Sequence, residues 1–212
     1  CIETLNNWID LLSQIFPEND RAALCRSYSE DVYAMVHERV KDIPDDERAR
    51  AFFLFQYNDS TIMTSGQLFF GQWWADAIGA VNVANELTTD NSVTVNLEQV
   101  YDWNPDIIFM TNFNTFQPDD LYDSTVGTYD WSGIQAVQDK SVYKMPLGMY
   151  RSYTPGIDTP ITLLWMAKTT YEDIDVTQRA IDYYETVFGV TLTPEQVETI
   201  FAPISAAGTL YF

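Results

Sequence analysis

Short apolar runs alternate with helical patterns after residue 50, and this alternation constrains the fold of the chain most strongly. Three apolar runs are predicted to be strands: AFFLFQY (51–57), DIIFM (106–110) and SVYKM (141–145). The first two are apolar on both faces, as buried parallel strands are. Helical patterns lie between these strands, at 71–81, 96–103 and 131–139. This order predicts β–α–β crossovers, and therefore an α/β fold with a mainly parallel sheet covered by helices on both sides.

Further helical patterns flank this region. Before it, apolar residues at i, i+3, i+4 and i+7 predict a helix around Trp8–Ile15 and a long second helix over about 20–41. Behind it, three patterns predict the closing helices 159–171, 176–188 and 193–204. The first and third begin with Thr-Pro, an N-cap followed by proline at the first helical position. We therefore divide the chain into a helix pair, residues 1–50, and an α/β unit, residues 51–212.

The charge of the chain argues against several kinds of partner. Eleven Lys and Arg stand against 31 Asp and Glu, which gives a net charge of −20. Such a surface repels phosphate backbones and anionic lipid head groups, so we expect no nucleic-acid partner. No apolar run approaches the roughly 20 residues of a membrane-spanning helix, and the first residues lack the order of a signal peptide. We expect a soluble chain that is either processed or part of a longer protein.

Residue types that carry catalysis or bind metals are scarce. His37, the single histidine, falls on the predicted long helix, where a Ser-His-Asp or Cys-His arrangement is not expected. Cys1 and Cys25 have no second thiol or histidine at metal-binding spacing. An antiparallel helix pair would hold these two cysteines far apart, which favours free thiols over a disulfide, and a lipid anchor on Cys1 is an alternative. We predict a non-enzymatic protein without a metal site or cofactor.

Three long loops follow the carboxyl ends of the predicted strands, where ligands bind in open α/β sheets. They span 58–72, 111–123 and 146–158, well beyond the usual length of about 2 to 6 residues. They carry aromatic, amide and hydroxyl side chains together with one arginine. The candidate ligand-binding residues are Ser65, Gln67 and Phe69 in the first loop, Asn112 and Phe113 in the second, and Tyr150, Arg151 and Tyr153 in the third.

Arg151 is the most informative of these residues. Six of the 11 basic residues lie at or before Arg50, and none lies between Ala51 and Asp139. A scarce cation among aromatic side chains suits a flat or conjugated anionic ligand, through stacking and a charge-assisted hydrogen bond. The alternative is a surface arginine paired with a nearby acid, with aromatic side chains that only seal the end of the sheet.

Four segments, in order, resemble blocks of the solute-binding proteins of ABC importers for ferric siderophores, haem and cobalamin. They are TSGQLFFGQWWADAIGAVNVANEL, NLEQVYDWNPDIIFM, WSGIQAVQDKSVYKMPLG and PGIDTPITLLWMAK. The resemblance runs through most of the chain after Ala51, and residues 20–40 resemble the long helix that joins the two lobes of such proteins. It implies a three-layer, Rossmann-like carboxy-terminal lobe preceded by the interlobe helix, with the amino-terminal lobe of the same protein missing.

The same resemblance implies a function and a location. The protein would bind a ferric siderophore or related metal chelate and deliver it to a membrane permease. It would act outside the cytoplasm, in the periplasm or as a lipoprotein at the outer face of the cell membrane. Asp158 holds the position of an acidic residue that docks on the permease in the family, although glutamate is more common there. Its ligand would be an iron complex, and no cofactor is implied.

Other functions stay open at this point. Molybdate or another oxyanion is bound by related proteins of this fold, and Thr64, Ser65 and Arg151 offer suitable groups. A nucleotide-dependent α/β enzyme domain would need a phosphate-binding turn, for which residues 58–67 are a weak candidate. A purely structural or interaction domain would bind no small ligand at all.

Overall fold

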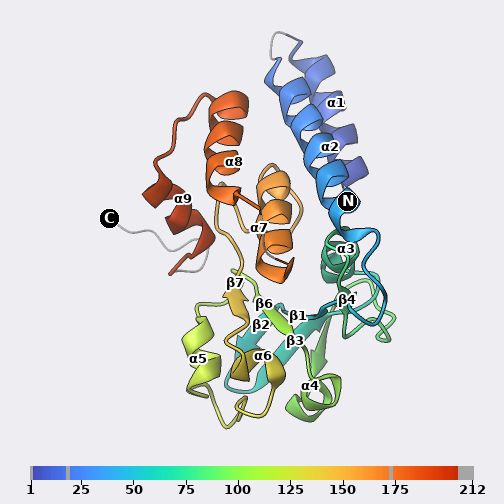
Figure 1. Cartoon of the computed structure of the whole chain (residues 1–212), viewed down its shortest axis with the longest axis vertical. Helices are drawn as coiled ribbons and strands as arrows, with labels where there is room; N and C mark the ends of the chain where they lie inside the picture. Colours follow the sequence, from blue (N-terminus) through green and yellow to red (C-terminus); the bar gives the residue numbers. More distant parts are fainter. Residues whose placement is uncertain (1, 18–19, 172–173, 205–212) are drawn as a thin grey trace.

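The computed structural model describes residues 2–17, 20–171 and 174–204. Figure 1 shows a half built of the helices α1, α2, α7, α8 and α9 above a half that contains the sheets. The elements are α1 (Ile2–Ile15), α2 (Arg21–Val40), β1 (Arg50–Leu54), β2 (Gln56–Asn58), β3 (Thr61–Ser65), α3 (Phe70–Ala77), β4 (Val81–Asn82), β5 (Ser92–Val95), α4 (Leu97–Trp103), β6 (Ile107–Met110), α5 (Pro118–Tyr122), α6 (Gln135–Gln138), β7 (Val142–Lys144), α7 (Thr159–Tyr171), α8 (Val176–Tyr183), the π-helix η1 (Tyr184–Phe188) and α9 (Pro194–Phe201).

A four-stranded parallel sheet in the order β4-β1-β6-β7 forms the centre of the molecule. In β1 and β6 every residue from Phe52 to Leu54 is fully buried, as is every residue from Ile108 to Met110. Such strands have to be covered on both faces, which agrees with their apolar sequences. The structure therefore confirms the predicted α/β fold with a mainly parallel sheet.

Two hydrophobic cores lie on the two faces of this sheet. Alternate side chains of a strand point to opposite faces, so Phe53 belongs to the core beneath α2, α3 and α7, while Phe52 belongs to the core with α4 and α6. Helix α7 lies within the first core, and all its residues from Thr159 to Ala167 are buried. The molecule thus has three layers, as predicted.

The helices α1 and α2 run side by side as a hairpin that projects beyond the sheet (Figure 1). One stripe of α2 is buried, at Cys25, Ser29, Val32, Val36 and Val40, which is the spacing of a one-sided helix. This stripe packs on α7 and η1 and belongs to the same core as the first face of the sheet. The predicted long helix is confirmed, whereas the division of the chain at residue 50 stays a prediction.

The region after β1 differs from the sequence prediction. The segment 51–57 is not one strand, because β1 ends at Leu54 and β2 pairs antiparallel with β3 in a separate sheet of order β2-β3-β5. Asn58 makes the turn of this hairpin, since its Oδ1 accepts the N–H of Ser60 at 3.0 Å. The predicted loop 58–72 therefore contains the strand β3 and the first residues of α3. Helix α3 also ends earlier than predicted, before Gly79, which has a left-handed backbone (φ +68°).

The thiol of Cys25, on α2, is free and buried against Tyr183, the last residue of α8. Its Sγ lies 3.5 Å from the hydroxyl of Tyr183. Burial raises the pKa of the Cys25 thiol. Cys1, for which we predict a free thiol, lies outside the described residues.

Candidate ligand-binding site

The carboxyl ends of β1, β6 and β7 meet at one edge of the parallel sheet. Beyond these ends the chain continues into Phe55, Thr111 and Met145. The hydroxyl of Thr111 donates to the carbonyl of Phe55 at 2.5 Å, and Nδ2 of Asn112 donates to the carbonyl of Met145 at 2.9 Å. These two hydrogen bonds tie the three strand ends together, so the loops that follow them form one continuous surface.

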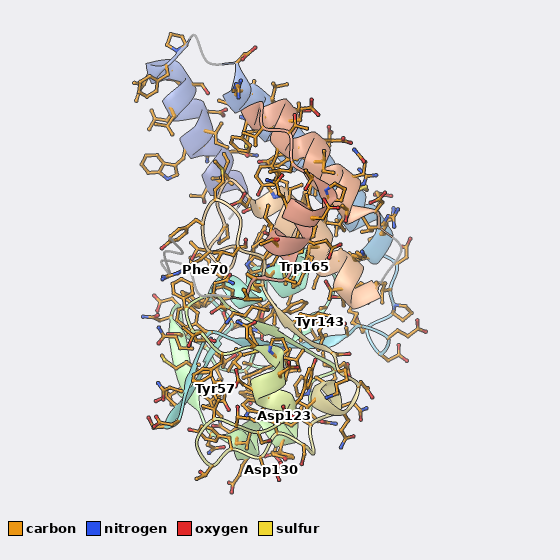
Figure 2. The ribbon with its side chains drawn as sticks, turned by 90° about the vertical axis from the view of Figure 1, so that its left-hand side faces the viewer. Tyr57, Phe70, Asp123, Asp130, Tyr143 and Trp165 are labelled. Carbon is orange, nitrogen blue, oxygen red and sulfur yellow. The ribbon has the colours of Figure 1, made fainter. Side chains whose placement is uncertain are left out.

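An aromatic cluster lies at this edge. The ring of Phe55 lies 4.9 Å from that of Phe113 and 5.7 Å from that of Phe69, between ring centroids. Tyr153 lies 5.5 Å from Phe55 and 5.9 Å from Phe70, and it is fully buried. Phe69, Phe70 and Phe113 are half-buried, and Figure 2 shows Phe70 between the helical half and the sheets. The cluster therefore has a buried centre and partly exposed rings around it.

Arg151 lies on the outer side of this cluster. Its guanidinium carbon lies 4.4 Å from the ring centroid of Phe113 and 5.7 Å from that of Tyr150. The arginine is half-buried, whereas Met149 and Tyr150 are each 60% exposed. A cation held against aromatic faces beside exposed apolar side chains can bind an anion that also has flat or apolar groups.

Around the buried Tyr153, the structure brings together four predicted site residues that are at least partly exposed: Phe69, Phe113, Tyr150 and Arg151. Gln67 is exposed nearby in the turn before α3. A role in ligand binding remains a prediction for all five. Phe55 was missed because the predicted strand runs to residue 57, whereas β1 ends at Leu54 and leaves Phe55 directly beyond the strand end, the position of a site residue.

The remaining predicted residues lie inside the protein. The hydroxyl of Ser65 accepts the N–H of Gly71 at 2.8 Å, and the hydroxyl of Thr64 donates to the carbonyl of Phe53 at 2.9 Å. Asn112 is buried, and its Oδ1 has no hydrogen-bond partner among the described residues. Tyr153 is also buried, and this burial raises the pKa of its hydroxyl. In this structure these groups support the site from within and do not reach its surface.

Asp158 is also buried, with 6% of its surface exposed. Its Oδ1 accepts the hydroxyl of Tyr184 at 2.5 Å, and its Oδ2 accepts the N–H groups of Met149 at 2.7 Å and Tyr150 at 3.3 Å. Burial raises the pKa of the Asp158 carboxyl, although the hydrogen bonds act in the opposite direction. Asp158 is thus enclosed in this structure, and the permease-docking role expected for it stays a prediction.

Lys144, at the end of β7, is a buried cation that the sequence analysis did not single out. Its Nζ donates to the backbone carbonyl of Asn114 at 2.9 Å, to Oδ1 of the same residue at 3.0 Å and to the carbonyl of Phe116 at 2.7 Å. Burial lowers the pKa of Lys144 to about 8. These bonds fix the loop that carries Phe113. Its place in the apolar strand SVYKM, at a position expected to be buried, was the signal in the sequence that could have identified Lys144.

The single histidine does not lie at this edge of the sheet, and the described residues form no metal site. His37 is exposed on α2, where its ring stacks on that of Tyr33 at 6.3 Å. Among the residues that the structure describes, no group of three or more His, Cys, Asp or Glu is arranged to hold a metal ion. An open, mainly parallel sheet covered by helices on both faces defines a unit of the Rossmann-like class.

Residues 2–147 match the family model of the periplasmic binding proteins. Because this match covers more than half of the chain, the chain belongs to that family. The family consists of solute-binding proteins, which confirms the prediction of a non-enzymatic protein, and it implies a location outside the cytoplasm. In the described part of the chain, every helix is too short or too polar to cross a membrane.

Individual relatives agree with this assignment. The chain is 24% identical over 201 residues to the molybdate-binding protein MolA of Haemophilus influenzae, which covers 90% of this chain and 53% of the relative. A periplasmic solute-binding protein from Veillonella parvula superposes with a TM-score of 0.85 at 28% identity, covering 95% of this chain and 61% of its own. CeuE of Helicobacter pylori, in a structure titled as a nickel–histidine complex, has the same fold, with a TM-score of 0.74 at 20% identity over 94% of this chain and 62% of its own.

The chain therefore spans only about half to three fifths of the length of these relatives. The comparisons support the resemblance to solute-binding proteins of ABC importers but do not specify a ligand. The expected amino-terminal lobe is not tested by them and stays a prediction.

Proposed function

We propose that this chain is part of the substrate-binding component of an ABC importer and that it binds an anionic metal chelate with flat or conjugated groups. A ferric siderophore is the leading example. The observation that carries this proposal is the guanidinium of Arg151, 4.4 Å from the ring centroid of Phe113 and beside the exposed Tyr150. The complete protein would act in the periplasm or as a lipoprotein at the outer face of the cell membrane, and would deliver its ligand to a membrane permease.

The character of the surface favours a chelate over a small inorganic ion. A small oxyanion is bound by several convergent hydrogen-bond donors, because each oxygen needs a partner once it leaves water. The hydroxyls of Thr64 and Ser65 are buried and bonded to the backbone, so Arg151 alone remains of the three groups considered for an oxyanion. Exposed Met149 and Tyr150 offer apolar contact area instead.

The acidic charge of the chain bears on the same proposal. A net charge of −20 repels an anionic ligand at long range. Arg151 acts at close range, and its half-buried position limits the screening of its charge by solvent. The expected second lobe would have to supply the remaining contacts, so this chain would contribute one side of the site.

Molybdate is the second candidate ligand. It is favoured by the sequence similarity to MolA, whose name gives molybdate as its ligand. For this ligand the guanidinium of Arg151 would act as the charged donor, with further donors contributed from outside this chain.

Thermal stabilisation of the full-length protein separates these candidates, since a ligand that binds only the folded state raises the melting temperature. The panel is a ferric tris-catecholate, a ferric hydroxamate, haem, cobalamin, nickel–histidine and molybdate. We expect a shift with one of the metal chelates, and we expect Arg151→Ala to abolish most of it. Lys140→Ala removes an exposed cation that lies over the ring of Tyr122 and serves as the control. A shift with molybdate alone would select the second candidate, and no shift at all would contradict both.

A further inference from the structure

The turn at residues 147–151 crosses directly over the carboxylate of Asp158. A Cβ atom on Gly148 would lie 2.8 Å from Oδ2 of Asp158 and 2.7 Å from the hydroxyl of Tyr184. Real Cβ atoms do not approach other atoms so closely, so glycine is required at this point. The backbone can therefore approach the carboxylate closely enough for Met149 and Tyr150 to donate their N–H groups to it.

The carboxylate itself is held from the opposite side. Tyr184, at the start of η1, donates its hydroxyl to Oδ1 at 2.5 Å. The carbonyl of Asp158 accepts the N–H of Thr162 in the first turn of α7 at 3.0 Å, and the hydroxyl of Tyr183 donates to the carbonyl of Ile157 at 2.6 Å. Asp158 is thus fixed to the helices α7 and η1, independently of the turn that it binds.

The turn held in this way carries the exposed part of the candidate site. Leu147 and Arg151 form an antiparallel bridge at its base. Its tip holds Met149 and Tyr150, whose N–H groups point to the buried carboxylate while their side chains are 60% exposed. Release of the two N–H groups would free the tip and loosen the position of Arg151 over Phe113.

We propose that Asp158 is a positioning residue of the ligand site, whose buried carboxylate holds the turn 147–151 so that Arg151 stays over Phe113. Hydrogen bonds to a buried charged group are stronger than those between neutral groups, and each N–H that loses such a partner remains unpaired unless water reaches it. The effect of Asp158 on affinity rests on the proposed function, whereas its effect on the turn does not.

The first arm of the test uses no ligand. In the Asp158→Ala variant of the full chain, we expect the amide hydrogens of Met149 and Tyr150 to exchange about tenfold faster or more by NMR. The Arg151 side-chain resonances should also move toward their unshifted positions, because the ring current of Phe113 no longer acts on them. The amide of Leu147, which donates to the carbonyl of Ile200 at 2.9 Å, should keep its protection.

Two further variants keep this arm decisive. Asp182→Ala removes an exposed carboxylate from the neighbouring helix α8 and should leave all these signals unchanged. Asp158→Asn keeps the shape and one acceptor oxygen, and should give a smaller change in the same direction; it carries the test should Asp158→Ala not fold. Unchanged exchange at Met149 and Tyr150 in both Asp158 variants would overturn the proposal.

The second arm measures affinity for a ferric tris-catecholate in the full-length protein. We expect Asp158→Ala to weaken binding about tenfold, and to have little further effect in an Arg151→Ala background, because both changes remove the same contact. Additive effects would overturn the claim that Asp158 acts through Arg151. If Arg151→Ala alone had no effect, the proposed function would fail, while the exchange of the two amides would still decide whether Asp158 holds the turn.

Discussion

The guanidinium of Arg151 lies 4.4 Å from the ring centroid of Phe113, although the two residues belong to loops that follow different strands, β7 and β6. The pair exists because parallel strands end at the same edge of a sheet. Asn112 and Lys144 stabilise this pair, since the side chain of each forms a hydrogen bond between the loop after β6 and the end of β7. The site is therefore a property of the sheet edge and not of either loop alone.

Removal of the ring under Arg151 should weaken binding of an anionic chelate. Phe113→Leu keeps an apolar side chain but loses the cation–π contact, and we expect about a 3- to 10-fold lower affinity for a ferric tris-catecholate by calorimetry. Phe116→Leu is the matched control, because Phe116 contacts the ring of Tyr57 at 5.4 Å in the other core. Equal losses in the two variants would contradict a specific role for Phe113.

Ser65→Ala should affect stability and leave binding unchanged. The substitution leaves the buried N–H of Gly71 without the hydroxyl that it now bonds, and a buried donor without a partner costs about 1 to 3 kcal/mol. Urea unfolding measures this cost, with the exposed Ser132→Ala as the control. A tenfold or greater loss of ligand affinity at full folding would instead restore Ser65 as a ligand residue.

Lys144 should make stability depend on pH in the alkaline range. Burial lowers the pKa of Lys144 from 10.5 to about 8 in the folded state. Between these two values the unfolded chain binds more protons at this position than the folded one, so the free energy of unfolding rises with pH. We expect it to rise by about 1 kcal/mol per pH unit relative to Lys144→Met, which cannot titrate there.

Urea unfolding of the native protein and the Lys144→Met variant at pH 7, 8, 9 and 10 gives this difference directly. Tyrosines and other lysines titrate in both proteins and cancel. Lys168→Met removes an exposed lysine and keeps Lys144, so its free energy of unfolding should follow that of the native protein in parallel over this pH range. Parallel curves for the native protein and Lys144→Met would contradict a lowered pKa.

Cys25 should report whether the hairpin of α1 and α2 stays closed on η1. Its thiol is 1% exposed, and burial raises its pKa, so little reactive thiolate is present and reagents cannot reach it. In a Cys1→Ser variant we expect labelling by a disulfide reagent to be at least about 100-fold slower in the native state than in urea. Fast labelling without denaturant would show that the hairpin opens readily.

Local patterns were sufficient for most of the secondary structure. Helix α7 has the predicted bounds, and β6 and α4 differ from the prediction by one residue at the start. The strand β6 and the helix α7 are predictable because each is an apolar run that is buried over most of its length. The hairpin of β2 and β3 was missed because its turn, at Asn58 and Ser60, lies within a run that also fits one long strand and a loop.

The sequence by itself determined the α/β class, the long helix and the edge of the sheet where the candidate site lies. These follow from local patterns, namely the apolar periodicity of each segment and the alternation of strands and helices along the chain. Only the tertiary structure decided which polar groups reach that surface. The side chains of Ser65 and Asp158 are buried and form hydrogen bonds with Gly71 and Tyr184. The Nζ of Lys144 donates to Asn114. Tyr184 and Asn114 lie 26 and 30 residues from the groups that they bond, and the burial of Ser65 depends on how β3 and α3 pack together, so no local pattern encodes these positions.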